Sequence, residues 1–204
     1  KVKDSESARR AYFQYFCSYP KDPLASDALL SIGDSLTEQG FYHKAIDIYK
    51  KIIREYAENE SSAAMEAQFR MAKTYMQMGD YRAAIPLFLK VRWKHFSEQT
   101  RFAIEYHIGS CLYLLNEYQD AGNVFVNYLA SGQDLEFAEN ASFLLGECLY
   151  KQNDYLSAFQ IFRKTIKNYP KNSKIPYGMY YMGKCLMAMN MAESAIKVFH
   201  DGMQ

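Results

Sequence analysis

The chain has 204 residues, of which 49% are apolar, and a formal net charge of +1. Its 24 basic and 23 acidic residues are well interspersed along the whole chain, which argues against a basic surface for nucleic acid or an anionic membrane. No apolar run reaches the roughly 18 residues that a membrane-spanning helix needs, so we expect no direct membrane span.

The chain is predicted to begin with a lone helix and to continue with repeated helix pairs. Residues 4–20 are predicted to be the second helix of a repeat whose first helix is missing, because 7–20 aligns with 157–170 at Ser, Ala, Tyr and Pro. We expect residues 1–204 to form a single domain that is a piece of a longer protein. The predicted complete repeats are 24–57, 62–96, 99–131, 136–170 and 173–203.

Three positions recur in every repeat at a period of 37 to 39 residues. The first is a small residue: Gly33, Ala72, Gly109, Gly146 and Gly183. Twelve residues later comes an alanine: Ala45, Ala84, Ala121, Ala158 and Ala195. Four residues further comes an aromatic residue: Tyr49, Phe88, Phe125, Phe162 and Phe199. Self-similarity at such a period is typical of a solenoid, whose stacked units bury a shared core.

Each repeat is predicted to be a helix, a tight turn and a second helix. Apolar residues within 138–151 and again within 155–168 follow helical spacing. Between the two helices stands a residue that tolerates the left-handed conformation: Gly40, Gly79, Asn116, Asn153 or Asn190. We expect the repeated small residue to let the two helices approach closely, and the aromatic residue to pack into the next repeat.

Three of the four cysteines share one repeat position. Cys111, Cys148 and Cys185 are 37 residues apart. Equivalent positions in stacked repeats lie about 10 Å apart, whereas the Cα atoms of a disulfide lie within about 7 Å. The spacing also differs from that of zinc ligands. These thiols are therefore predicted to be reduced and buried, while Cys17 stands apart in the first helix.

The small residue, the alanine, the aromatic residue and the terminal Tyr-Pro pair resemble the pattern of tetratricopeptide repeats over essentially the whole chain. The resemblance implies an all-α fold, a right-handed superhelix (α-solenoid) of about five and a half helix-turn-helix repeats. "Gly-x-Cys-Leu-Tyr" and "Asn-Tyr-Pro-Lys-Asn-Ser" are similar to a bacterial envelope subgroup. This subgroup includes the Tol-Pal-associated protein and the β-barrel assembly lipoprotein.

The same resemblance implies where a partner would bind. In this family the first helix of each repeat lines an inner concave surface, at positions two, five, nine and twelve when the small residue is counted as position eight. The aromatic side chains at these positions are expected either to bind a partner or to pack between helices. The predicted partner-binding residues are Phe69, Lys73, Tyr106, Tyr113, Phe143, Tyr150, Tyr177, Tyr180 and Lys184.

The sequence predicts a binding protein and not an enzyme. Its four histidines are scattered, without the spacing of a metal site, and no phosphate-binding loop occurs, so neither a cofactor nor a metal is expected. We expect a scaffold that binds peptide segments of partner proteins and no nucleic acid, in the periplasm or cell envelope of a bacterium. The alternative is a cytoplasmic adaptor or regulatory domain fused to an effector outside this segment.

Overall fold

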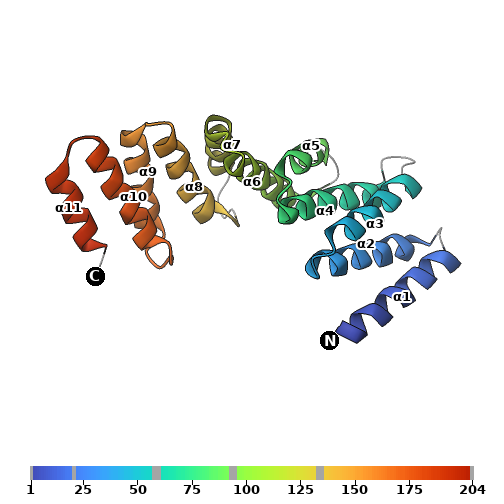
Figure 1. Cartoon of the computed structure of the whole chain (residues 1–204). Helices are drawn as coiled ribbons and strands as arrows, with labels where there is room; N and C mark the ends of the chain where they lie inside the picture. The colour runs from blue at the N-terminus through green and yellow to red at the C-terminus, as the bar shows by residue number, and fades with distance from the viewer. Residues whose placement is uncertain (1, 20–21, 57–60, 92–95, 132–135, 203–204) are drawn as a thin grey trace. The chain divides into compact units, whose positions relative to one another are not determined.

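The computed structural model describes residues 2–19, 22–56, 61–91, 96–131 and 136–202, which form helices joined by turns (Figure 1). These residues contain no β-strand, so the all-α prediction is confirmed. The predicted segment ends at residues 20, 57 and 203 lie outside the described residues. In chain order the helices are α1 Val2–Ser18, α2 Pro23–Glu38, α3 Tyr42–Glu55, α4 Ser62–Met78, α5 Tyr81–Val91, α6 Glu98–Leu114, α7 Tyr118–Ala130, α8 Ala138–Lys151, α9 Tyr155–Asn168, α10 Ile175–Ala188 and α11 Ala192–Asp201.

The helices gather into two compact units, residues 1–95 and 96–204, where the sequence predicted one domain. Within each unit, every helix packs against the next helix in the chain. The first helices of consecutive repeats also touch, since α2 contacts α4 in the first unit and α8 contacts both α6 and α10 in the second. The helix pairs are therefore stacked, and within each unit we call the face formed by the first helices the inner face. None of the described helices is long and apolar enough to cross a membrane.

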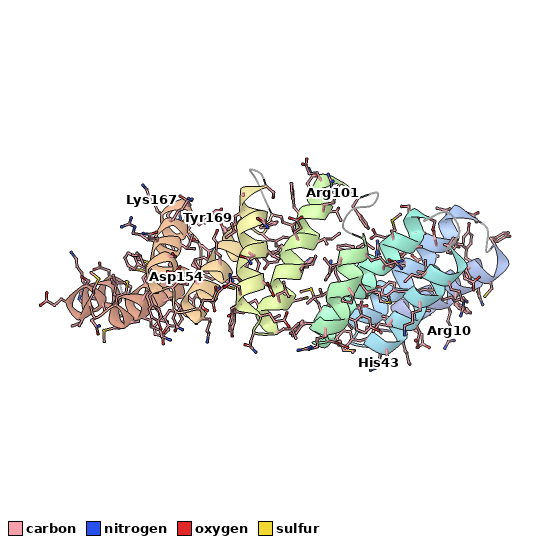
Figure 2. All side chains as sticks on the ribbon, turned by 90° about the horizontal axis from the view of Figure 1, so that it is seen from above. Arg10, His43, Arg101, Asp154, Lys167 and Tyr169 are labelled. Carbon is pink, nitrogen blue, oxygen red and sulfur yellow. The ribbon has the colours of Figure 1, made fainter. Side chains whose placement is uncertain are left out.

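The turns inside the five repeats share one backbone geometry. Gly40, Gly79, Asn116, Asn153 and Asn190 have φ angles between 61° and 86°, which confirms the predicted left-handed turns. The N–H group of the following residue donates to the carbonyl five positions earlier, as from Asp154 to Leu149 at 3.0 Å. The Asp154 carboxylate, whose residue is labelled in Figure 2, also caps α9, because it accepts a hydrogen bond from the Ser157 N–H at 3.1 Å.

The repeated aromatic ring lies against the small residue of its own repeat. A Cβ atom added at Gly109 or Gly146 would lie 2.7 Å from the ring of Phe125 or Phe162, respectively. Both rings are fully buried. The ring also packs into the next repeat, as expected, since Phe125 shares one buried cluster with Ala141 and Leu145 of the next repeat. The alanine and the aromatic residue are one turn apart, so both face the first helix of the same repeat. Phe162 also stacks on Tyr181 of the next repeat, at 5.4 Å between ring centroids.

The three repeat cysteines lie in this core, as predicted. Cys111, Cys148 and Cys185 have no exposed surface, and all are free thiols. Burial raises the pKa of Cys111 and Cys148 to about 12 and that of Cys185 to about 11. Because the thiolate is the reactive form, these side chains are chemically protected at neutral pH. Cys17 is exposed.

Replacing Gly146 with alanine should destabilise the protein, because the new methyl group meets the buried Phe162 ring. Overpacking of this kind costs about 1–3 kcal/mol of unfolding free energy. Gly122→Ala is the matched control, since a Cβ atom at Gly122 finds its nearest neighbour at 3.5 Å. That variant should be neutral or more stable, because alanine is the better helix former. Equal urea midpoints for the two variants would contradict the packing described here.

Thiol labelling should separate the four cysteines at pH 8. Cys17 is expected to react rapidly with an aromatic disulfide reagent, because its side chain is exposed. The three core thiols should react only as fast as the protein opens, because burial holds their pKa far above the ordinary value. In guanidinium chloride all four should react at once. Rapid labelling of all four in the folded protein would refute this assignment.

Candidate functional site

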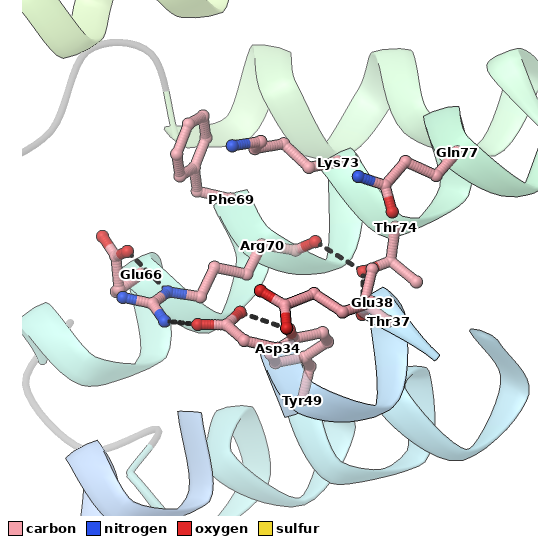
Figure 3. Close-up of a pocket in the computed structure, with 10 residues that line it drawn as sticks. All are labelled: Asp34, Thr37, Glu38, Tyr49, Glu66, Phe69, Arg70, Lys73, Thr74 and Gln77. Carbon is pink, nitrogen blue, oxygen red and sulfur yellow. Dashed lines mark hydrogen bonds and ion pairs between the residues drawn. The ribbon is translucent and has the colours of Figure 1, made fainter. Parts of the chain in front are cut away.

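The inner face of the first unit contains a pocket of about 360 Å³ between α2 and α4 (Figure 3). Its wall from α2 carries carboxylates and a hydroxyl, and its wall from α4 carries cations, a phenyl ring and an amide. Tyr49 reaches the pocket from α3. The lining residues are Asp34, Thr37, Glu38, Tyr49, Glu66, Phe69, Arg70, Lys73, Thr74 and Gln77.

An ion-pair network centred on Arg70 forms one end of the pocket (Figure 3). The Arg70 guanidinium donates from Nη1 to Asp34 and from Nε to Glu66 at 2.7 Å. The Tyr49 hydroxyl donates to the other Asp34 oxygen at 2.8 Å. Burial acts to lower the pKa of Arg70, but its bond to Glu66 and the charges of both carboxylates outweigh this and leave it raised. The network therefore links the first helices of two consecutive repeats.

The rest of the pocket combines a second inter-repeat link with open functional groups. The Thr37 and Thr74 hydroxyl oxygens lie 3.0 Å apart, so α2 and α4 are joined here as well. The Lys73 ammonium lies 5.6 Å from the centre of the Phe69 ring. Lys73 and Glu38 are exposed, whereas Phe69 is half-buried. The pocket thus offers a cation, an anion and an apolar ring beside a fixed polar base.

In the second unit the inner face is built around a buried carboxylate. Glu147 of α8 is 5% exposed, and it accepts a hydrogen bond of 2.6 Å from the Tyr113 hydroxyl of α6. Burial and the bond to Glu147 raise the pKa of Tyr113. Burial and a hydrogen bond to Glu147 likewise raise the pKa of Tyr177 on α10. Phenol groups from two neighbouring first helices therefore solvate this carboxylate in place of water.

Beside Glu147, three tyrosine rings surround the ammonium group of Lys184. The Lys184 nitrogen lies 4.8 Å from the ring centre of Tyr150 and 5.4 Å from those of Tyr180 and Tyr181. Attraction between a cation and the faces of aromatic rings holds the side chain in place. Lys184 is the single charged residue of α10. The result is a fixed positive charge on an otherwise aromatic surface.

Comparisons with known proteins agree with this architecture. Residues 27–59 and 66–95 match the family model of the tetratricopeptide repeat, and residues 129–201 match that of anaphase-promoting complex, cyclosome, subunit 3. The chain carries tetratricopeptide repeats. A search of curated proteins finds no match.

Several solved structures share this tetratricopeptide fold. A MamA structure has a TM-score of 0.69 and 23% identity, over 84% of this chain and 92% of that one. BtubC (BKLC) from P. vanneervenii has a TM-score of 0.75 and 14% identity, over 99% and 89%. YrrB, described as a TPR protein with an unusual peptide-binding site, has a TM-score of 0.72 and 16% identity, over 95% and 91%. At these identities the similarity establishes the fold alone.

Two of the predicted partner-binding residues pack inside the tetratricopeptide stack. Phe143 is 1% exposed, and its ring would lie 2.9 Å from a Cβ atom added at Gly178, so its assignment to an open inner surface was wrong. Tyr106 is half-buried and stacks on Phe137 with ring centroids 4.4 Å apart. The physical reason is the direction of position five, which points toward the following helix pair in these repeats.

The structure brings the other predicted residues together in two groups. Phe69 and Lys73 line the pocket of the first unit. The second group lies on the inner face of the second unit: Tyr113, Tyr150, Tyr177, Tyr180 and Lys184. Tyr177 and Tyr180 are 39% and 51% exposed. Their role in binding stays a prediction.

Sequence reasoning missed Arg70, Tyr49 and Tyr181, which organise both groups. Arg70 and Tyr181 occupy position six, which the expected inner positions left out. Tyr49 had been assigned to the core alone, yet its hydroxyl extends to the inner face. The sequence did contain a signal for Arg70. It follows Asp34 by 36 residues, so the two opposite charges stand about one helical turn apart in the registers of adjacent repeats.

We predict that the protein loses stability as the pH rises above about 10, the ordinary pKa of tyrosine. The folded protein keeps the phenol protons of Tyr49 and Tyr113, whose pKa values are raised, at a pH where the unfolded chain releases them. Their contribution is complete below pH 10 and is lost above it, by at most about 1.4 kcal/mol per pH unit for each.

Urea unfolding between pH 9 and 11 measures this effect. The double variant Tyr49→Phe/Tyr113→Phe should be less stable at neutral pH but should have a shallower alkaline slope than wild type. Tyr12→Phe is the control, because Tyr12 is 44% exposed. An identical slope in all three proteins would show that other groups govern alkaline unfolding.

Proposed function

We propose that this chain is a non-enzymatic scaffold whose inner helix faces bind peptide segments of partner proteins. The observation that carries the proposal is the pocket between α2 and α4. Four of its lining residues, Asp34, Glu66, Phe69 and Lys73, stand at positions that tetratricopeptide repeats turn toward the inner face. A concave surface with a few fixed polar groups and an apolar wall is the usual form of a ligand site.

The chemistry of the pocket suits a peptide with mixed side chains. Phe69 offers an apolar contact, while the exposed Lys73 and Glu38 offer charges of both signs. The Arg70 network and the threonine pair fix the base of the pocket before any ligand arrives. Such preorganisation supports binding, because less conformational entropy is lost when the complex forms.

The second unit supports the same proposal with different chemistry. Tyr150 and Tyr180 present aromatic surface around the fixed charge of Lys184. Tyrosine rings bury a large area at small entropic cost, which is why they are common at the centres of interfaces. YrrB, described as a TPR protein with an unusual peptide-binding site, lends support by analogy.

We further propose that the protein acts in a bacterial cell-envelope assembly, on the basis of the sequence patterns described above. A cytoplasmic adaptor is the alternative, and the free core thiols favour it because periplasmic proteins meet an oxidising environment. Fractionation of the native cells, followed by immunodetection, decides between the two. Recovery with periplasmic markers supports the envelope role, and recovery with cytoplasmic enzymes supports the adaptor.

A peptide library displayed on phage tests the scaffold proposal directly. Peptides selected on the wild-type protein should lose about tenfold in affinity for Lys73→Glu, which reverses the charge at the pocket wall. Lys90→Glu is the matched control, because Lys90 is equally exposed but lies on α5, outside the pocket. Fluorescence anisotropy measures both affinities. Failure to enrich any peptide, or equal affinities for the two variants, would contradict peptide binding in this pocket.

A further inference from the structure

The near-neutral charge of the whole chain conceals a separation of charge in its second half. Residues 155–192 contain six basic residues and no acidic one. The preceding segment, residues 98–154, contains nine acidic residues and two basic ones. The charges that appear interspersed over the whole sequence are therefore segregated here, and the basic segment coincides with α9 and α10.

Five of the six basic residues gather on α9 and the loop after it, and all five are exposed. Helix α9 turns Ala158, Phe162 and Thr165 into the core. Its opposite side carries the cations, as Figure 2 illustrates for Lys167 at the end of the helix. The five basic residues, which we call the basic strip, are Arg163, Lys164, Lys167, Lys171 and Lys174.

The positive charge of the basic strip is not neutralised within the unit. Among the described residues, none of its five members forms an ion pair. Lys174 donates to the Asn140 amide oxygen at 2.7 Å, and the Arg163 guanidinium lies 6.0 Å from the centre of the Phe159 ring.

Carboxylates on α8 and at the start of α9 have hydrogen-bond partners outside the basic strip. Glu139 of α8 accepts a hydrogen bond from Asn172 in the loop. Asp154 caps the N-terminus of α9, about 20 Å from the other end of a 14-residue helix. The cations of the basic strip are therefore available to attract the carboxylates of a partner.

Apolar side chains continue the basic strip toward the start of α9. Leu156, Phe159, Arg163 and Lys167 follow one another at intervals of three or four residues, so they share a face of the helix. Leu156 is 58% exposed and Phe159 is half-buried. Along this outer face of α9, the side chains are therefore apolar near the N-terminus of the helix and basic near its C-terminus.

We propose that this outer face of α9 binds an acidic segment of a partner protein, in which apolar side chains accompany several carboxylates. A nucleic-acid backbone would use the cations but leave Leu156 without a matching contact. An anionic membrane would engage a surface several helices wide, whereas α7, the second helix of the preceding repeat, has no Lys or Arg and exposes Asp120. The basic strip is one helix wide, as a single bound segment requires.

The test uses a synthetic peptide of alternating Glu and Leu residues, with its Gln-Leu counterpart as the uncharged probe. Wild-type protein should bind the Glu peptide more tightly, and rising salt should weaken that binding. Lys164→Gln/Lys167→Gln should weaken it by about fivefold, since exposed ion pairs contribute modestly. Lys50→Gln/Lys90→Gln is the matched control, because it removes two equally exposed lysines from α3 and α5.

Three outcomes would overturn the proposal. The control variant could lose as much affinity as the α9 variant, which would indicate a net-charge effect. The Gln peptide could bind as well as the Glu peptide. An oligonucleotide duplex or phosphatidylserine vesicles could bind through Lys164 and Lys167 while the Glu peptide does not. Because none of these experiments involves the pocket lined by Lys73, their failure leaves the proposed function of the inner face standing.

Discussion

The contact between a small residue on the first helix and an aromatic ring on the second sets the geometry of each repeat. At Gly33, Gly109 and Gly146 the absence of a side chain lets the ring lie against the helix backbone. The ring in turn fills the core, where Tyr49, Phe125 and Phe162 are almost completely buried. Helix pairs held this closely can stack regularly, and the inner face depends on that regularity.

The same contact explains a difference between the two inner faces. In the first repeat the ring belongs to Tyr49, and its hydroxyl continues past Gly33 to hold Asp34. In the third and fourth repeats the ring is a phenylalanine, which has no hydroxyl to offer. There the buried Glu147 receives its hydrogen bonds from Tyr113 and Tyr177 on neighbouring first helices. The two inner faces therefore hold their carboxylates with different donors.

Position nine illustrates how one backbone frame holds different chemistry. Asp34 and Glu147 both stand there, and in each case a donor from the next repeat binds the carboxylate: Arg70 or Tyr177. These bonds join consecutive first helices, so they fix the inner face and give each carboxylate a hydrogen-bond donor. The outer face of α9 differs in kind, because its cations form no ion pair among the described residues.

Periodicity in the sequence was sufficient to predict the helices, the left-handed turns and the buried thiols. Each depends on local constraints: an apolar face, a positive φ angle, or a small residue at a fixed repeat position. Asn153 and Cys148 could be assigned because every repeat supplies an independent example of the same environment.

The candidate site depends on contacts between side chains of different repeats, and only the tertiary structure shows which contacts form. Phe143 and Tyr180 share position five, yet one is 1% and the other 51% exposed, because exposure depends on what packs against that position. Arg70 acquired its role only when α4 came to lie beside α2, where Asp34 joined Glu66 of its own helix at the guanidinium. A sequence pattern gives the direction of a side chain from its own helix. The neighbouring helix determines whether that side chain becomes core, part of a polar network or open surface.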